Sequence, residues 1–544
     1  MLLVISAQEG VKPQTEEHLA ICNLLGVRRG VVAVTKVDTV SQEQLEATLA
    51  QIQSLLGESF LGRSNAATVT VSARTGAGLD DLRSELKSLA MGTRCNQDHG
   101  LRLPIDRAFI MKGFGTVVTG TLLSGSIETG QSLALEPGGL IARVRGVQVH
   151  NRPETQANGR CRVALNLAGI DVSEISRGQT LVDGQSFGAV TNIDVEVTLL
   201  PSCSGLKHRA RVHFHAFTSD AMAAVSLYGY KGMEAGESRL LRLKLAKPMV
   251  LVPGDRFVLR QASPAVTIGG GRILGAHPIA NLRKSNCLQW LDQLRNSSLE
   301  NELLLRVSRR GISGMEMRQL MTETGLSRDV LLRATKEALK NGSLIQIPCG
   351  TFIAREHVDS STARITALLN TDVHGTGLKR SALKSRLNLH AEVLDFVIEM
   401  LAGQQKLVIK GEVIHDLRIE SPISSAEQNA LAAIENAFRS AGLATPSVAE
   451  VAAKLQLAGP EMRRLMTLLL REKTLLKMGH EEVYLHRDAV EALRRQLSQL
   501  SGQSIDVAGF KQMTGVSRKY AIPLLEFLDR ERVTRKVEDR RIVL

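Results

Sequence analysis

The chain has 544 residues, a formal net charge of +13 and a pI near 9.6. This length corresponds to about three to five domains and excludes a single-domain protein. The excess of Lys and Arg favours a polyanionic partner, either nucleic acid or an anionic surface.

Neither membrane insertion nor secretion is indicated. No run reaches the roughly 20 apolar residues of a spanning helix, and the first five residues lack the charged flank of a signal peptide. The six cysteines are scattered without a C-x-x-C pair or ligand spacing. We therefore predict a cytoplasmic protein with reduced thiols, no metal site and no membrane partner.

Residues 1–92 alternate strand and helix patterns, which indicates a parallel, doubly wound sheet. Strands are expected at residues 2–6, 30–35 and 67–71, and helices at about 15–25, about 41–56 and from 79 onward.

The second expected strand ends in the stretch Thr35-Lys36-Val37-Asp38. A carboxylate at this place can accept hydrogen bonds from N1–H and the exocyclic amine of guanine, a donor pair that adenine lacks. The stem of Lys36 would cover the base plane, and the third strand ends in a second polar loop. The predicted guanine-binding residues are Thr35, Lys36, Asp38, Ser72 and Ala73. A solvated turn is the alternative for so short a match.

The phosphate half of a nucleotide site has no counterpart in the sequence. There is no Gly-x-x-x-x-Gly-Lys-Ser/Thr loop and no upstream Asp-x-x-Gly segment for magnesium. Electrostatic stabilisation of the phosphates supplies most of the catalysis in phosphoryl transfer. We therefore expect no catalytic residue and no GTP hydrolysis from this chain as written. The sequence is expected to begin inside the domain, because of a misassigned start codon or a split gene.

Short β-branched strands and Gly-rich turns follow, and they favour two antiparallel β-barrels. The expected barrels cover residues 101–187 and 188–280. His213 and His215 share a strand face without a third ligand nearby, which favours a structural role.

From about residue 285, helices followed by short strands recur about every 60 residues. The pattern predicts four tandem winged-helix units, each a helix-turn-helix with a β wing. Their expected bounds are 285–356, 357–420, 424–486 and 487–544. Such units bind nucleic acid, or they serve as spacers and protein contacts.

The last unit is the most basic of them. Its second helix starts with Arg518 and Lys519, where recognition helices meet their target, and its wing carries several cations, among them Arg535, Lys536 and Arg541. A basic wing with Phe510 and Tyr520 close by suits a folded RNA with splayed bases better than bare duplex. Because carboxylates are interspersed, a solvated face is the alternative.

A guanine-reading α/β piece, two barrels and four winged-helix units in this order resemble the bacterial selenocysteine-specific translation elongation factors. Residues 1–92 would then be the C-terminal part of a P-loop-type GTPase domain, with Thr35 where Asn is more usual. The resemblance implies GTP and Mg²⁺ as cofactors. It also implies selenocysteyl-tRNA, an mRNA hairpin and the ribosome as partners, and delivery of that tRNA at a recoded UGA codon. The last winged-helix units of this family bind the hairpin, so the resemblance implies that Arg518, Lys519, Arg535 and Lys536 are RNA-binding residues.

Asp106, Arg107 and Arg162 fall where this family carries the residues proposed to contact the selenocysteyl group. A selenol is largely ionised at neutral pH and serine is not, so two guanidinium groups balanced by one carboxylate could favour the selenolate. A barrel salt bridge without a ligand is the alternative for these residues. For the whole chain the alternatives are a truncated, non-hydrolysing RNA adaptor and another translational GTPase with a winged-helix tail.

Overall fold

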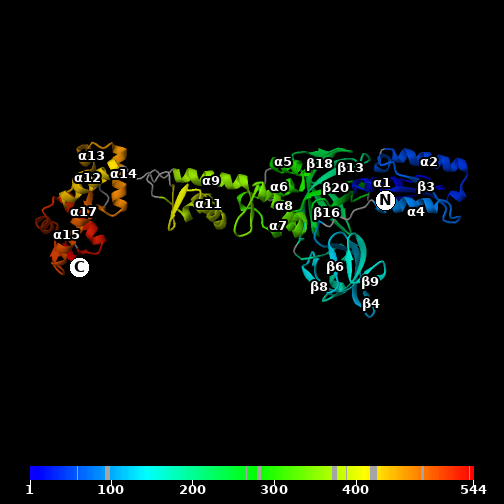
Figure 1. Ribbon diagram of the computed structural model, residues 1–544, viewed down its shortest axis with the longest axis horizontal. Coiled ribbons are helices and arrows are strands. Elements are labelled where there is room, and N and C mark those ends of the chain that lie inside the picture. The colour runs from blue at the N-terminus through cyan, green and yellow to red at the C-terminus, as the bar shows by residue number, and fades with distance from the viewer. Residues whose placement is uncertain are drawn as a thin grey trace. The chain divides into compact units, whose positions relative to one another are not determined.

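The computed structural model describes residues 1–57, 59–91, 98–184, 186–264, 266–278, 284–370, 377–387, 389–416, 425–478, 483–537 and 540–544. The predicted boundaries near residues 92, 280 and 420 lie outside these ranges. The chain forms two compact units, residues 1–358 and 359–544, and the elements of both are labelled in Figure 1.

The first unit opens with a parallel α/β domain. Its elements are β1 (Leu2–Ser6), α1 (Pro13–Leu24), β2 (Val31–Thr35), the 3-10 turn η1 (Val37–Thr39), α2 (Gln42–Leu56), α3 (Phe60–Arg63), β3 (Thr68–Thr70) and α4 (Leu79–Met91). The strands lie in the order β1-β2-β3, with Val4 opposite Ala33 and Ala33 opposite Val69. The first four residues of β2 are buried and Thr35 is half-buried, because α2 and α4 cover opposite sides of the sheet (Figure 1). The predicted doubly wound pattern is confirmed for these three strands.

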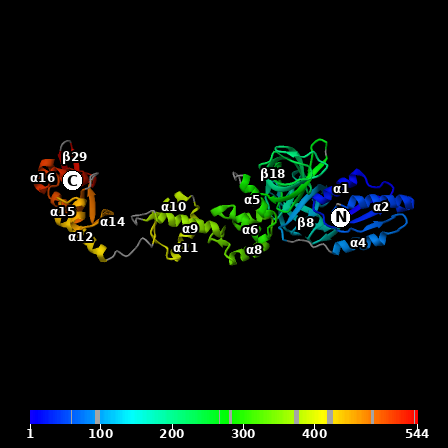
Figure 2. The ribbon, with the colours of Figure 1, turned by 90° about the horizontal axis from the view of Figure 1, so that it is seen from above.

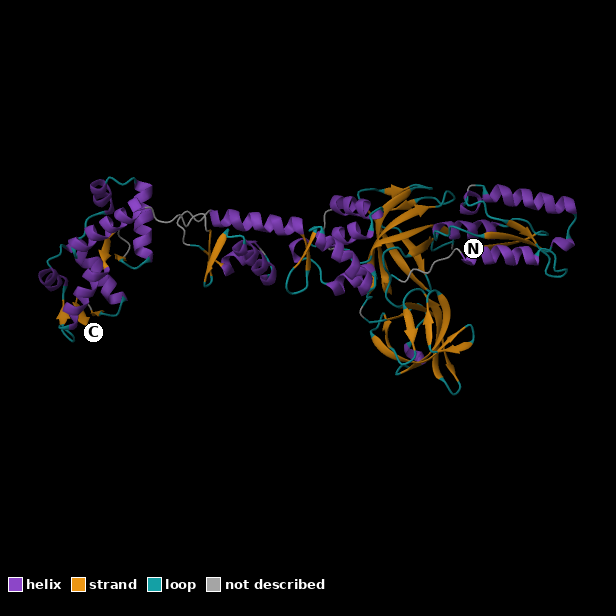
Figure 3. Cartoon of the chain, in the orientation of Figure 1, coloured by secondary structure: helices purple, strands orange, loops and turns teal. Residues whose placement is uncertain are grey.

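The first barrel closes because β11 pairs with both β5 and β8. Its ring has six strands, β11-β5-β4-β12-β7-β8, and β9 extends it beside β8. The elements are β4 (Arg102–Met111), β5 (Gly115–Leu122), β6 (Ser126–Glu128), β7 (Ser132–Glu136), β8 (Leu140–Val149), β9 (Arg152–Glu154), β10 (Gln156–Asn158), β11 (Cys161–Ala168), η2 (Val172–Glu174) and β12 (Thr180–Val182). As predicted, the described part of this region contains no long helix (Figure 3).

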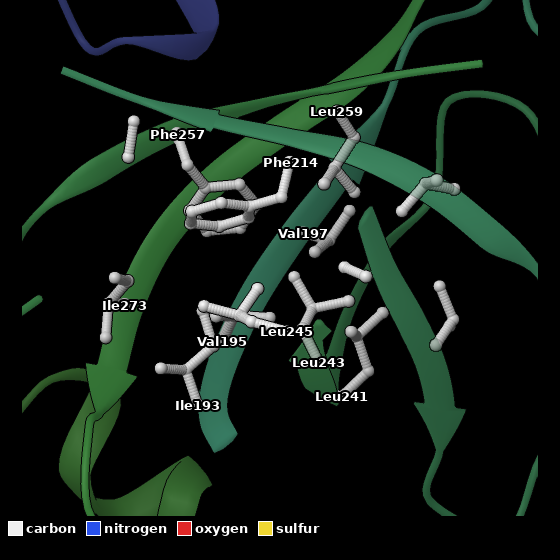
Figure 4. Packing of buried hydrophobic residues seen from close by; sticks show 14 of the residues in the cluster. Ile193, Val195, Val197, Phe214, Leu241, Leu243, Leu245, Phe257, Leu259 and Ile273 are labelled. Atoms are coloured by element: carbon white, nitrogen blue, oxygen red, sulfur yellow. The ribbon is translucent and has the colours of Figure 1, made fainter. Parts of the chain in front are cut away.

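The second barrel is a closed ring of six strands in the order β13-β18-β16-β15-β19-β20. The elements are β13 (Ala189–Leu199), β14 (Leu206–Lys207), β15 (Arg211–Ala216), β16 (Ser219–Leu227), β17 (Gly232–Met233), β18 (Ser238–Val250), β19 (Arg256–Arg260) and β20 (Thr267–Gly275). Alternate side chains fill its interior, where the rings of Phe214 and Phe257 stack with centroids 5.0 Å apart (Figure 4).

The α/β domain is attached to the second barrel through α1. The Oγ1 of Thr267 on β20 donates a hydrogen bond to Glu17 on α1, at 2.8 Å. Gly270 lets the helix approach, since a Cβ there would lie 3.2 Å from the Cβ of Leu24. The two domains therefore share a packed interface.

The first unit ends with helices and a small antiparallel sheet. These are α5 (Lys284–Arg295), α6 (Leu299–Ser308), η3 (Gly311–Ser313), α7 (Met317–Thr324), α8 (Arg328–Lys340), β21 (Leu344–Gln346) and β22 (Phe352–Ala354). The turn from α7 to α8 passes through Gly325, which has a φ of 69° as the helix C-cap. This helix-turn-helix with a β wing lies where the sequence predicts it.

The boundary between the units falls within α9 (Arg355–Asn370), and three further groups of helices and strands follow. The first is β23 (Leu378–Lys379), α10 (Arg380–Leu387), α11 (Ala391–Gly403), β24 (Leu407–Lys410) and β25 (Val413–Asp416). The second is α12 (Ser425–Ala441), α13 (Val448–Leu455), α14 (Gly459–Arg471), β26 (Leu475–Met478) and β27 (Val483–His486). The third is α15 (Arg487–Ser498), β28 (Ser504–Ile505), α16 (Val507–Thr514), α17 (Arg518–Arg530), β29 (Thr534–Val537) and β30 (Arg540–Val543) (Figure 2). No helix among the described residues is long and apolar enough to cross a membrane.

Candidate functional site

The two predicted guanine-reading loops meet at the carboxyl ends of β2 and β3. Because both strands are parallel, their ends lie at the same edge of the sheet. Ser72, fully buried, donates its hydroxyl to Oδ1 of Asp38 at 2.6 Å. The structure thus brings together two residues that are 34 positions apart in the sequence.

Asp38 is held as an ionised acceptor in this loop. The hydrogen bond from Ser72 is the main reason that the pKa of its carboxyl lies below the usual value, and the guanidinium of Arg74 adds to this effect. The Nε of Arg74 lies 2.7 Å from Oδ2. A carboxylate offers about four lone-pair positions, so Asp38 still has acceptor capacity for two N–H donors of a base.

A cavity of about 590 Å³ opens beside these loops. Thr35, Lys36, Asp38 and Arg74 are among its polar lining residues, and Ala73 together with apolar side chains of β1, β2 and α4 lines much of the rest. Lys36 has a left-handed backbone with a φ of 60°, and its ammonium lies 3.9 Å from Glu9. A mostly apolar cavity with one convergent carboxylate fits a purine base.

The contacts from Arg74 and Glu9 could not be foreseen from the sequence pattern. Arg74 follows Ser72-Ala73 in an exposed loop, and Glu9 precedes α1 by several residues. Both make their ion pairs only because the loops after β1, β2 and β3 lie at one edge of the sheet.

In the described ranges, no group of three or more His, Cys, Asp or Glu side chains is arranged to hold an ion. The rings of His213 and His215 stack on each other, with centroids 6.1 Å apart. The described residues that fit a nucleotide are therefore those that line the base cavity, and no described residue is assigned to Mg²⁺.

The second predicted pocket lies on the outer face of the first barrel. Arg107 on β4 is paired opposite Thr119, and Arg162 on β11 is paired opposite Thr121. Thr119 and Thr121 are two residues apart on β5, so both point to one face. The two arginines therefore flank β5 on the same face.

A β-bulge brings Asp106 to that face too. The register of β4 against β5 shifts between Ile105 and Arg107, which turns Asp106 out of the regular alternation. Its Oδ1 accepts a hydrogen bond from Thr119 at 2.6 Å, and its Oδ2 lies 2.6 Å from Nη1 of Arg162.

This barrel site is cationic and open to solvent. Partial burial would raise the pKa of Asp106, but the hydrogen bonds from Thr119 and Arg162 and the charges of Arg162 and Arg107 outweigh it, so the pKa is lowered. The side chain of Arg162 is 57% exposed despite its ion pair. Two guanidinium groups beside one ionised carboxylate leave a net positive charge for an anionic ligand.

The four predicted RNA-binding cations all lie on the surface of the last group of elements. Arg518 and Lys519 form the first turn of α17, and Arg535 and Lys536 lie on β29. All four are exposed. In the described residues they form one basic helix end and one basic strand.

Two other expectations for this group are wrong. Phe510 is fully buried in the core between α16 and α17, so it cannot stack on a base. Arg541 is also buried, and its Nε lies 2.8 Å from Asp529, which makes it a structural ion pair rather than a wing cation. The apolar periodicity of the helix pair, rather than the aromatic residue type, would have placed Phe510 in the core.

A parallel α/β domain followed by two six-stranded barrels is the arrangement of a translational GTPase. Sequence models of this class match at the expected places. The elongation factor Tu GTP binding domain matches residues 1–91, and elongation factor Tu domain 2 matches residues 115–182.

Two more specific models match further parts of the chain. The β-barrel domain of selenocysteine-specific elongation factors matches residues 192–280, and the winged helix of elongation factor SelB matches residues 495–543. The selenocysteine-specific elongation factor of Desulfomicrobium baculatum is 32% identical over 553 residues, covering 99% of this chain and 87% of that protein. The chain belongs to the family of selenocysteine-specific elongation factors.

Two further relatives agree. The selenocysteine-specific elongation factor of Escherichia coli K12 is 29% identical over 98% of this chain and 85% of its own length. A crystal structure of a bacterial selenocysteine-specific elongation factor shares the fold, with a TM-score of 0.63 at 24% identity, over 100% of this chain and 86% of that one. The GTP-binding domain match starts at residue 1, and the expectation of a truncated start stays a prediction.

Proposed function

We propose that the protein delivers selenocysteyl-tRNA to the ribosome at a recoded UGA codon and reads an mRNA hairpin with its C-terminal winged-helix units. The observation that carries this proposal is the pair Arg107 and Arg162 around Asp106 on one face of the first barrel, in a chain of this family. Delivery to the ribosome places the protein in the cytoplasm.

The site residues take distinct roles in this proposal. Asp38 and Ser72 select guanine, with Thr35, Lys36 and Ala73 forming the walls of the base cavity. Arg107 and Arg162 hold the selenolate, and Asp106 positions Arg162. GTP would be held at its base by the residues of this cavity and would supply the nucleotide that this class of protein uses, and no described residue is assigned to its phosphates or to Mg²⁺. No step of the proposal depends on where the phosphates or the metal lie.

The C-terminal half is proposed to consist of four winged-helix units at residues 285–356, 357–420, 424–486 and 487–544. Support comes from the four antiparallel strand pairs β21–β22, β24–β25, β26–β27 and β29–β30, each preceded by a pair of helices. Residues 1–92, 101–187 and 188–280 are the proposed GTPase part and the two barrels. Because the chain belongs to the family of selenocysteine-specific elongation factors, the alternative of another translational GTPase with a winged-helix tail is excluded.

Titration of the chain with fluorescent GTP distinguishes the delivery factor from the RNA adaptor, because a GTP-dependent delivery factor binds GTP tightly and an adaptor does not.

Replacing Arg162 with Ala is expected to reduce the preference for selenocysteyl-tRNA over seryl-tRNA by about 10- to 100-fold, the range of one hydrogen bond to a charged group. Affinities for both aminoacyl-tRNAs are measured by equilibrium binding. Arg145→Ala removes an exposed arginine of β8 in the same barrel and serves as the matched control. Unchanged discrimination in Arg162→Ala would refute the selenolate role.

Replacing Arg535 and Lys536 together with Gln is expected to weaken binding of the cognate mRNA hairpin. Each lost phosphate contact lowers the slope of log affinity against log salt by about 1, so the slope is expected to fall by about 2. Titrations of a labelled hairpin at several salt concentrations measure both quantities. Arg495→Gln, on the exposed face of α15, is the control. Equal binding of a scrambled hairpin by the wild type would count against hairpin reading.

A further inference from the structure

Helix α8, the second helix of the first helix-turn-helix, exposes a row of cations that the sites described above do not use. Arg333, Lys336 and Lys340 follow one another at intervals of three and four residues, so they lie on one side of the helix. All three are exposed, and within the described ranges none of them forms an ion pair. At a rise of 1.5 Å per residue they extend over about 10 Å along the helix.

Arg355 continues this row beyond the end of α8. Its Nε donates a hydrogen bond to the carbonyl oxygen of Gly342, in the turn that follows Lys340, so the exposed guanidinium is fixed beside the helix end. The neighbouring carboxylate of Glu356 is engaged by the hydroxyl of Ser308. The α8 cation row is therefore defined by four residues, Arg333, Lys336, Lys340 and Arg355.

The carboxylates of α8 reduce the charge of the row without neutralising it. Asp329 and Glu337 are exposed, and each lies four residues from Arg333. Neither carboxylate forms an ion pair with the described residues. Four cations against two carboxylates leave an excess of positive charge, and a surface of this sign attracts a polyanion.

The packing of α8 does not require these cations. Helix α11, the second helix of the next group of elements, buries its side chains at the same spacing as α8. The buried residues are Val330, Leu331, Ala334, Thr335 and Ala338 on α8, and Val393, Leu394, Val397, Ile398 and Leu401 on α11. At this alignment Lys336 corresponds to Glu399, and α11 contains no Lys or Arg. The same packing is thus built with the opposite charge on the exposed face, which leaves the row on α8 for a partner.

The turn before α8 is packed against the barrels. The N–H of Ser327 donates a hydrogen bond to the carbonyl oxygen of Asp98, just before the first barrel, at 2.7 Å. Gly325 leaves no room for a side chain, since a Cβ there would lie 2.6 Å from Val252, which follows β18. Because residues 1–358 form one compact unit, α8 keeps a fixed position relative to the barrels.

We propose that the α8 cation row binds the phosphate backbone of a double-helical stem of the tRNA whose aminoacyl end lies at the first barrel. Unpaired Arg and Lys side chains on a rigid helix bind a duplex through its phosphates without reading its sequence. The tRNA is favoured over the mRNA hairpin, because the hairpin is assigned to the last group of elements, in the other compact unit. The inference rests on the proposed function in taking an aminoacyl-tRNA as the RNA held by the barrels.

The test uses the full chain with fluorescently labelled selenocysteyl-tRNA and seryl-tRNA, and affinities are measured between about 50 and 200 mM salt. The triple variant R333Q/K336Q/K340Q is expected to bind both tRNAs about 10- to 100-fold more weakly. Its slope of log affinity against log salt is expected to fall by about 3, or about 1 for each lost phosphate contact. The preference for selenocysteyl-tRNA over seryl-tRNA is expected to stay at the wild-type value, because a stem contact does not involve the aminoacyl group.

Three further variants separate charge from shape. R333K/K336R/K340R keeps the charges of the row and is expected to keep the wild-type affinity and slope. Glu337→Gln removes a carboxylate beside the row and is expected to strengthen tRNA binding about 2- to 5-fold. Lys87→Gln, exposed on α4, is the control for loss of a cation elsewhere. Thermal unfolding of every variant shows that the fold is kept.

Wild-type affinity and slope in the triple variant would overturn the proposed surface. Loss of mRNA hairpin binding in that variant, with tRNA binding unchanged, would also overturn it, because the row would then serve a different RNA. A wild-type chain that binds no tRNA would overturn the proposed function together with the surface. A triple variant that behaves like a tRNA-binding wild type overturns the surface alone.

Discussion

Replacing Glu323 with Gln is expected to destabilise the junction between the second barrel and the first winged-helix group by about 3–5 kcal/mol, the cost of leaving buried charges without their partner. Glu323 lies on α7 and is almost fully buried. Its carboxylate contacts Arg310, lies 2.7 Å from Nη2 of Arg309, and lies 3.9 Å from Nη1 of Arg306.

The effect is expected to be large because two of these arginines also donate hydrogen bonds to backbone carbonyls at and just after the end of the second barrel. Arg306 is 1% exposed, and it donates to the carbonyl oxygen of Leu274 at the end of β20, at 2.8 Å. Arg309 donates to the carbonyl oxygen of His277 at 3.1 Å. Burial would raise the pKa of Glu323, but the charges of Arg309, Arg310 and Arg306 lower it, so the carboxylate is ionised at neutral pH. A neutral amide would leave a net positive cluster in a dry site.

Trp290 provides the measurement. It is the only tryptophan of the chain, and the guanidinium of Arg309 lies 4.1 Å from its ring centroid. Urea unfolding followed by tryptophan fluorescence therefore reports on this junction. The control is Glu337→Gln, an exposed glutamate on α8, which is expected to unfold at the wild-type midpoint. Coinciding transitions for wild type and Glu323→Gln would contradict the role assigned to the cluster.

Replacing Asp38 with Asn is expected to lower the affinity for guanine nucleotides by about 100-fold or more, because guanine N–H donors would be left facing an amide that carries its own donors. The same variant is expected to lose its discrimination between guanine and inosine nucleotides, since inosine lacks the exocyclic amine. Calorimetric titration with both nucleotides measures the two effects. Asp81→Asn, exposed on α4, is the control.

The proposed contact between the Asp38 carboxylate and guanine also has a predictable pH dependence. Because Ser72 lowers the pKa of Asp38 below its usual value, the carboxylate is charged throughout the neutral range. Guanine affinity that depends on this charge is present above the ordinary carboxyl range and is lost only as the pH falls through the lowered pKa. A decline of affinity between pH 8 and 6 would point to another titrating group.

Local patterns predicted the secondary structure well. The helix expected at about residues 41–56 is α2 (Gln42–Leu56), and the turn before α8 uses Gly325 in the left-handed conformation. Both features depend on contacts within a few residues, namely helical periodicity and the freedom of glycine at a C-cap. Composition likewise indicated the shift from α/β to barrel to helix-rich segments.

The sequence could not show how distant side chains pair. Asp106 joins the two arginines of its barrel only because a bulge in β4 changes its direction. Arg102 and Asp255 meet across 153 positions.

The sequence by itself determined the order of domains, the strand that leads into the loop of Asp38 and the basic character of the last group of elements, because these follow from local periodicity and composition. The tertiary structure alone decided which charges are paired and which are left for a ligand. Strand register and domain packing set those pairings, and neither leaves a signal in the spacing of residues along the chain.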